Sequence, residues 1–326
     1  MPVRTYLEAI TDALREEMNR DERIFIMGED VCAYGGSYAV TGRLCDEFGP
    51  QRVRDTPIAE GGIAGVATGA AMGGMRPVCE IMTINFALLA MDAIINHAAK
   101  VHYMFGGKVK APVIFRTAGG AGAQLGATHA QNFEVYFAHA PGLKVLTPAF
   151  PADAKGMMKM ALRQDDPILF IESTGLYRTR GEVPDGDYTT PIGSARIARE
   201  GKDITLISYS RMVLVAMQAA EQLAKMGVEA EVVDLRSLRP WDAETVIESI
   251  KKTNRGVIIE EDWQSYGVGA EIAATVMREA FDYLDGPIER VGLAEVPLPY
   301  ARDLEQAAMP KPQDVINKLR EMRVIR

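Results

Sequence analysis

Short apolar runs alternate with helical periods along most of the chain, and this alternation is typical of an α/β protein. In the first half, apolar runs predict strands at residues 23–30, 77–82, 111–117, 143–148 and 167–173. Helical spacing predicts helices at residues 1–21, 58–74, 86–107 and 153–163, the last of them capped by Asp153. Strands that are joined by helical crossovers imply a mostly parallel sheet.

The same pattern restarts after a change in composition. Residues 177–192 are charged and contain Gly, Pro and Asp, which indicates an interdomain linker. Beyond the linker, strands are predicted at residues 203–210, 230–238 and 256–262, with helices at 212–226, 242–252 and 270–280. We therefore expect two doubly wound α/β domains, at residues 1–176 and 193–326.

Composition excludes several classes of protein. The 326 residues are 48% hydrophobic and 25% charged, as in an ordinary globular protein. Lys and Arg number 36 against 44 Asp and Glu, and this net charge of −8 argues against nucleic-acid binding. No apolar stretch is typical of a membrane span, and the acidic N-terminal pattern does not fit a targeting peptide. We expect a cytoplasmic protein.

Cysteines and histidines give no sign of a metal centre. Cys32, Cys45 and Cys79 form no CxxC pair, so reduced thiols are the simplest expectation. The four histidines form neither an HExxH nor an HxH pattern, so we expect no zinc site.

Glu60 is the most informative candidate for chemistry. It stands between Ile58-Ala59 and a run of Gly and Ala in the segment 55–77. A carboxylate on a wall of small residues is partly desolvated, which raises its pKa and strengthens its hydrogen bonds. The alternative is an ordinary acid in the first turn of a helix, where it favours the helix dipole.

Three further segments carry candidate residues. Met82 and Phe86 follow a strand and could form an apolar shelf for a flat ring, although for a Met and a Phe in isolation core packing is the more common explanation. His129 follows a glycine-rich loop at the expected start of a helix, where it could donate a proton or simply cap the helix. Glu29 ends the first strand, where most acids are solvated turn residues.

Eight motifs carry a family resemblance. In chain order they are GED, TPIAE, EIMTINF, GATHAQ, PGLKV, DAKG, DLRSLRPWD and VPLPYA. Together they resemble the beta-subunit family of the pyruvate dehydrogenase decarboxylating component, within the transketolase-like thiamine enzymes. The resemblance covers nearly the whole chain. It implies a pyrimidine-binding domain followed by a transketolase C-terminal-type domain.

The resemblance also implies roles for the candidate residues. Glu60 would hydrogen-bond the pyrimidine ring of thiamine diphosphate and favour its imino form, while Met82 and Phe86 would pack against that ring. His129 would line the channel by which a lipoyl group arrives. Glu29 would belong to a chain of carboxylates between two active sites.

A potassium site is a further implication of the resemblance. Its ligands would come from Val113, Ala161, Leu162, Gln164 and Asp166. Many relatives have Asp and Asn where this chain has Gln164 and Asp166. The residue types differ, but both positions still carry a side-chain oxygen, the type of ligand that a hard cation needs.

The missing diphosphate motif points to a second polypeptide. Thiamine enzymes bind the diphosphate through Mg²⁺ with a GDG motif, and the nearest match here is Asp185-Gly186-Asp187 in the linker. The resemblance therefore implies an alpha subunit that holds Mg²⁺ in an α₂β₂ assembly. It further implies decarboxylation of pyruvate and acetylation of a lipoyl domain on a dihydrolipoamide acyltransferase core, with the C-terminal domain supporting dimerisation and docking.

Other functions remain open from the sequence. Close relatives of the same family act on branched-chain 2-oxo acids or acetoin. A non-catalytic nucleotide-binding or electron-transfer subunit is a more remote alternative, because the glycine-rich segment lacks GxGxxG spacing after a strand.

Overall fold

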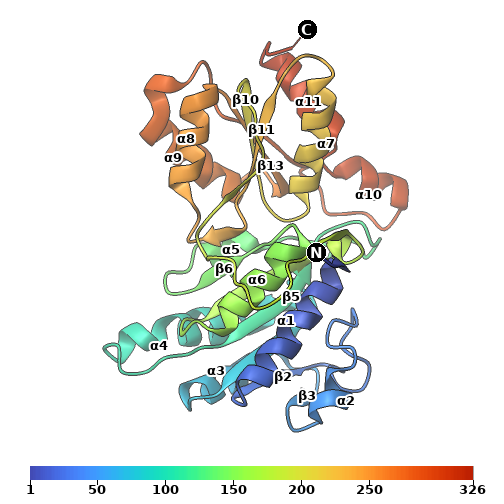
Figure 1. Ribbon diagram of the computed structural model, residues 1–326, viewed down its shortest axis with the longest axis vertical. Helices are drawn as coiled ribbons and strands as arrows, with labels where there is room; N and C mark the ends of the chain where they lie inside the picture. Colours follow the sequence, from blue (N-terminus) through green and yellow to red (C-terminus); the bar gives the residue numbers. More distant parts are fainter. Residues whose placement is uncertain (326) are drawn as a thin grey trace. The chain divides into compact units, whose positions relative to one another are not determined.

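The computed structural model describes residues 1–325, which form two compact units (Figure 1). The first unit contains residues 1–119 and 136–192. The second contains residues 120–135 and the chain from Gly193 onward. The sequence does not reveal that the segment 120–135 groups with the later residues, and the domain boundaries proposed above stay a prediction.

A parallel sheet with the strand order β6-β7-β5-β4-β2-β3 forms the first unit. Its strands are β2 (Ile24–Gly28), β3 (Val53–Asp55), β4 (Arg76–Ile81), β5 (Ile114–Gly119), β6 (Lys144–Leu146) and β7 (Ile168–Ser173). All residues of β2, β5 and β7 are buried, as expected for a parallel sheet that is covered on both faces. The five strands predicted for this half are confirmed, and β3 is additional.

Helices of this unit follow the predicted pattern with two corrections. They are α1 (Tyr6–Arg20), α2 (Leu44–Phe48), α3 (Glu60–Met72), α4 (Ala99–Met104) and α6 (Pro151–Leu162). Asp153 does not cap α6, because Pro151 begins the helix with a φ that proline fixes in advance and Phe150 is the N-cap. The predicted single helix at 86–107 is also wrong. It is a 3₁₀ turn, η1 (Phe86–Ala90), then a π-helical segment, η2 (Asp92–Ala98), and then α4.

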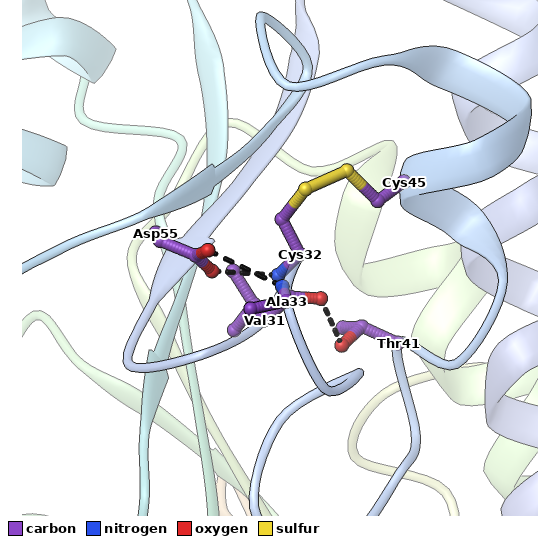
Figure 2. The surroundings of a disulfide bond; sticks show 6 residues. All are labelled: Val31, Cys32, Ala33, Thr41, Cys45 and Asp55. Atoms are coloured by element: carbon purple, nitrogen blue, oxygen red, sulfur yellow. Dashed lines mark hydrogen bonds between the residues drawn. A yellow bond between two sulfur atoms is a disulfide. The ribbon is translucent and has the colours of Figure 1, made fainter.

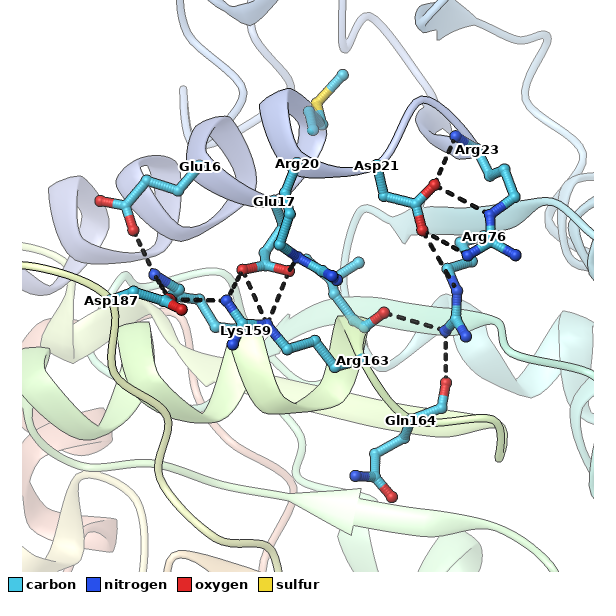
Figure 3. Close-up of polar contacts among 12 residues, drawn as sticks. Glu16, Glu17, Arg20, Asp21, Arg23, Arg76, Lys159, Arg163, Gln164 and Asp187 are labelled. Carbon is cyan, nitrogen blue, oxygen red and sulfur yellow. Dashed lines mark hydrogen bonds and ion pairs between the residues drawn. The ribbon is translucent and has the colours of Figure 1, made fainter.

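Ion pairs join α1 to α6 and to the predicted linker (Figure 3). Glu16 accepts from Lys155 at 2.6 Å and from Lys159 at 2.5 Å, and Glu17 accepts from Arg163 at 2.5 Å. The linker adds a carboxylate, Asp187, which lies 2.6 Å from Lys159 and 2.7 Å from Arg163. The only near-match to a diphosphate motif therefore serves helix packing. Within the linker, β8 (Arg180–Glu182) also pairs with β1 (Val3–Thr5).

The second unit has a sheet in the order β14-β13-β10-β11-β9. Its strands are β9 (Arg196–Arg199), β10 (Ile204–Ser208), β11 (Ala230–Asp234), β13 (Gly256–Trp263) and β14 (Glu289–Leu293), and β12 (Ser237–Arg239) follows β11. Its helices are α7 (Met212–Ala224), α8 (Ala243–Thr253), α9 (Val268–Ala280), α10 (Arg302–Ala308) and α11 (Pro312–Glu321). Only β9 is antiparallel to its neighbour in this sheet, so the predicted parallel α/β pattern is confirmed.

A disulfide joins Cys32 to Cys45 (Figure 2). The expectation of three reduced thiols is therefore wrong for these two, and only Cys79 is free, buried in β4. The chain folds back between the two cysteines, which brings their Cα atoms to 5.0 Å. A separation of 13 positions in the sequence does not reveal this fold.

None of the helices within residues 1–325 combines the length and the apolar character that crossing a bilayer requires.

Candidate active site

Three of the predicted site residues follow neighbouring strands of the first unit. Glu29 comes directly after β2, Met82 comes directly after β4, and Glu60 begins α3 shortly after β3. Because β2 pairs with β3 on one side and with β4 on the other, these strand ends are neighbours. Ligands of α/β sheets bind outside the carboxyl ends of the strands, so this edge is the candidate active site.

Glu29 and Glu60 are both buried carboxylates at this edge. Their exposed fractions are 7% and 6%. Burial raises the pKa of Glu29, and the negative charges of Glu60 and Asp30 raise it further. One carboxylate oxygen of Glu29, Oε1, has no hydrogen-bond partner among the described residues. Such a carboxyl group can keep a proton at pH values where an exposed glutamate is ionised, and it can offer that proton to a ligand.

Helix α3 places small residues beside Glu60. A Cβ atom at Gly61 would lie 3.1 Å from the carbonyl oxygen of Leu89, so η1 approaches the helix closely at this point. Cβ atoms at Gly65 and Gly69 would meet nothing within 4 Å. The sequence prediction that Glu60 lies buried on a wall of small residues is confirmed.

A buried ion cluster supports this edge, and sequence reasoning missed it. Arg116 in β5 is 3% exposed and binds Glu172 of β7 through Nε at 2.5 Å and Nη2 at 2.8 Å. It also donates to Glu80 in β4, and the Tyr177 hydroxyl donates to Glu172 at 2.7 Å. Burial raises the pKa of Glu80, while the Arg116 charge opposes this shift. One charged residue inside each of three apolar strand runs was the signal that could have found the cluster.

Met82 and Phe86 are half-buried rather than core residues. Met82 is the first residue after β4, and Phe86 begins η1. The chain between them turns sharply, because the Phe86 N–H donates to the Thr83 carbonyl oxygen at 2.9 Å. Both side chains therefore keep apolar surface near the strand ends, which suits contact with a flat heteroaromatic ring.

Comparison with known proteins identifies the family. A model described as the transketolase pyrimidine-binding domain matches residues 3–180, and one for the transketolase C-terminal domain matches residues 193–315. The mitochondrial pyruvate dehydrogenase E1 component subunit beta of Dictyostelium discoideum is 50% identical over 96% of this chain and 89% of its own length. The chain belongs to the family of pyruvate dehydrogenase E1 component beta subunits.

Other relatives agree with this placement. The beta subunit from Rickettsia felis is 49% identical over 98% of both chains. A solved structure named as a split-gene transketolase, an inactive beta4 tetramer, has a TM-score of 0.80 at 25% identity and covers 99% of both chains. The predicted fold class, a pyrimidine-binding domain followed by a transketolase C-terminal-type domain, is confirmed.

The predicted site residue His129 lies in the second unit. The other predicted site residues, Glu29, Glu60, Met82 and Phe86, lie in the first unit. His129 is exposed, and its Nδ1 atom lies 2.9 Å from the Thr128 hydroxyl oxygen. It does not start a helix as predicted, because α5 (Glu134–Ala138) begins five residues later. The glycine-rich backbone before it forms turns instead of helix.

Carboxylates of the second unit hold this glycine-rich segment. Glu261 of β13 accepts from the Ala121 N–H at 2.7 Å and also pairs with Arg211. Glu305 of α10 accepts from the N–H groups of Gly122 and Gln124 at 3.0 and 3.1 Å. Sequence reasoning did not find these anchors, which come from residues more than a hundred positions away.

The five residues of the potassium prediction lie in the first unit, and oxygens of Leu162, Gln164 and Asp166 already face protein cations. Arg76 donates to the carbonyl oxygens of Leu162 and Gln164 at 3.1 and 2.6 Å (Figure 3). Asp166 lies 2.8 Å from Lys144, which also donates to the Gln164 side chain. The Val113 carbonyl oxygen accepts from a backbone N–H. No cluster of three acidic, His or Cys ligands occurs within residues 1–325, and the potassium site stays a prediction.

Proposed function

We propose that the chain is the beta subunit of a thiamine-dependent pyruvate dehydrogenase that works as an α₂β₂ assembly. The proposed reaction is oxidative decarboxylation of pyruvate with acetylation of a lipoyl group on a dihydrolipoamide acyltransferase core. The observation that carries the proposal is the buried pair Glu29 and Glu60 at a strand-end edge. Relatives over nearly the whole chain are named as E1 beta subunits.

The residues at this edge fit the pyrimidine half of thiamine diphosphate. An aminopyrimidine offers ring nitrogens and an amino group, which pair with carboxyl groups such as that of Glu60. Met82 and Phe86 supply apolar contacts, and the unpartnered oxygen of Glu29 extends the acidic set. When bound, the cofactor would supply the electron sink that decarboxylation of a 2-oxo acid needs. In this proposal Glu60 holds and moves a proton at the pyrimidine, and His129 steadies protons where the lipoyl group arrives.

Exposed apolar side chains near Glu60 support a partner subunit. Ile58, Val66 and Leu89 are 78%, 61% and 68% exposed, and they lie on or beside α3 and η1. Apolar surface of this kind on a soluble chain marks an interaction site. We propose that an alpha subunit covers it and supplies the Mg²⁺ and diphosphate ligands, because this chain has no GDG motif. Potassium binding by the first unit, docking by the second and a cytoplasmic location belong to the same proposal.

The test is an activity assay on the purified chain, alone and together with a matching GDG-containing alpha chain. We expect pyruvate decarboxylation only from the pair, with thiamine diphosphate and Mg²⁺ present. Full activity from the lone chain would contradict the division of the site between two polypeptides.

Substrate choice needs a separate assay. Pyruvate, 2-oxoisovalerate and acetoin should be compared with the assembled enzyme at matched concentrations. The proposal predicts the highest kcat/KM for pyruvate, and a preference for either other substrate would assign the chain to a sister activity of the same family.

A further inference from the structure

The disulfide between Cys32 and Cys45 is a modification that neither the family match nor the proposed chemistry assigns (Figure 2). Cys32 lies in the loop after β2, and Cys45 lies in α2. Their Cα separation of 5.0 Å is within the range that disulfide geometry allows. Both residues are partly exposed, so dissolved thiols can reach them, whereas Cys79 is fully buried.

The loop that this bond closes has no regular secondary structure and is held by turns, hydrogen bonds and the disulfide. Residues 29–43 contain neither strand nor helix. Their backbone turns through positive φ at Gly35, Gly36 and Ala39, the last of which is unfavourable for a residue with a side chain. Hydrogen bonds within the loop include one from the Gly36 N–H to the Asp30 carbonyl oxygen and one from the Thr41 hydroxyl to the Val31 carbonyl oxygen, each at 2.9 Å. A covalent bond across such a loop limits the conformations that it can adopt when these hydrogen bonds open.

This loop is packed against the buried carboxylates of the candidate active site. It begins at Glu29 itself. Gly36 lies directly against the carboxylate of Glu80, where any Cβ atom would collide with Oε1. The Tyr38 ring lies 5.4 Å from the ring of Tyr177, whose hydroxyl binds the Arg116 cluster through Glu172. The loop is therefore in direct contact with the ion cluster that supports the candidate active site.

We propose that Cys32 and Cys45 form a redox-sensitive clip that holds the loop over the candidate active site when oxidised and releases it when reduced. The consequence for cofactor binding rests on the proposed function, whereas the clip itself rests on the local structure. Exposed disulfides are commonly the labile and regulatory ones, which fits two partly exposed cysteines better than a static brace does.

The chemistry is thiol–disulfide exchange with a small dithiol or disulfide. A thiolate of the dithiol attacks one sulfur, and the Cys32–Cys45 bond breaks to give a mixed disulfide. The second thiol of the reagent then displaces the protein thiol, so two electrons and two protons end on the cysteines and the reagent leaves as a disulfide. The reverse reaction needs an oxidised small-molecule disulfide.

Thiol counting tests whether the clip exists. The full chain is equilibrated with oxidised glutathione, unfolded without reductant and alkylated. We expect one alkylated cysteine under these conditions and three after treatment with dithiothreitol. Three labelled cysteines in both samples would overturn the proposal.

Amide hydrogen exchange then tests whether the clip orders the loop. Reduction should accelerate exchange in residues 30–45 by roughly tenfold or more in the unaltered chain. The double variant Cys32→Ser/Cys45→Ser should exchange fast with or without reductant, while Cys79→Ala should respond as the unaltered chain does. Equal exchange in the oxidised and reduced chains would overturn the role of the bond.

The consequence for the site is measured on the assembled enzyme. Reduction should raise the KM for thiamine diphosphate by roughly fivefold or more in the unaltered enzyme. The KM of the Cys32→Ser/Cys45→Ser enzyme should be the same with and without reductant. An unchanged KM together with a changed exchange rate would overturn the link to the site. Should the assembly show no thiamine-dependent activity at all, the proposed function fails, while thiol counting still decides whether the clip exists and hydrogen exchange whether it orders the loop.

Discussion

In each unit one carboxylate accepts two backbone N–H donors of a loop, but only the loop of the first unit also carries a disulfide. Asp55 accepts from two consecutive N–H groups, of Cys32 and Ala33, at 2.7 and 3.2 Å. Glu305 accepts from two N–H groups of the glycine-rich segment 120–126 at 3.0 and 3.1 Å. The two anchors use the same chemistry in different surroundings.

Burial of the anchor separates the two loops. Asp55 is exposed, so water competes for its hydrogen bonds and they contribute little. Glu305 is fully buried, so removing it takes a buried acceptor away from two N–H donors. A loop with a buried anchor is stable without a cross-link, whereas a loop with an exposed anchor gains most from a covalent bond.

The largest effect is expected for the covalent bond. Cys45→Ser should lower the free energy of unfolding by about 3 kcal/mol in non-reducing buffer, because the bond closes a short loop in the unfolded chain. Urea unfolding measures the change. In dithiothreitol the variant and the unaltered chain should unfold alike, and a difference that survives reduction would show that the serine disturbs packing instead.

The buried anchor should give a smaller effect. Glu305→Ala should lower the free energy of opening of the glycine-rich segment by about 2 kcal/mol, because two N–H donors lose their acceptor. Amide exchange of Gly122 and Gln124 reports this directly. The matched change Asp55→Ala should accelerate exchange of its own loop far less while the disulfide is intact, and equal effects would break the comparison.

A pH-dependent effect is expected from another acid of the second unit, Glu260. Burial raises its pKa from 4.5 to about 7, although the Gly269 N–H donates to it at 2.9 Å. Between these values the folded chain keeps a proton that the unfolded chain has lost. The free energy of unfolding therefore falls as pH rises through this window, by at most about 1.4 kcal/mol per pH unit for one group.

Glu260→Gln removes this titration. The variant should match the unaltered chain near pH 4.5 and become relatively more stable up to about pH 7, with no further change above it. Urea unfolding at several pH values gives the difference. A flat profile for Glu260→Gln would mean that its carboxyl group is not protonated in the folded chain.

Periodicity predicted the parallel architecture because buried strands appear as continuous apolar runs. It could not predict the irregular segment 86–104, where helix type changes twice within one apolar stretch. The apolar pattern of this segment does not specify which backbone hydrogen bonds form within it. Both η1 and η2 pack against α3, a contact that the pattern alone does not reveal. Position along the chain also gave no sign of the disulfide, or of the grouping of residues 120–135 with the second unit, because both depend on the tertiary fold.

Sequence located part of the candidate active site. Glu29 and Met82 were found because they follow predicted strands, whose ends meet at one edge of a parallel sheet, and Glu60 because it stands before a run of Gly and Ala. The partners Arg116 and Glu172 were missed because their pairing depends on strand order, which is set by tertiary contacts.

The central claim is that the Glu60 carboxyl group contacts the pyrimidine of thiamine diphosphate at the boundary with an alpha chain. The most direct test is the rate of hydrogen–deuterium exchange at the thiazolium carbon of the cofactor in the assembled enzyme. Glu60→Gln should slow this exchange by at least about 100-fold while assembly and cofactor occupancy persist, and Glu221→Gln should leave it unchanged. Exchange in Glu60→Gln within about twofold of the unaltered enzyme would contradict the account, because such a difference is far below a general acid–base contribution.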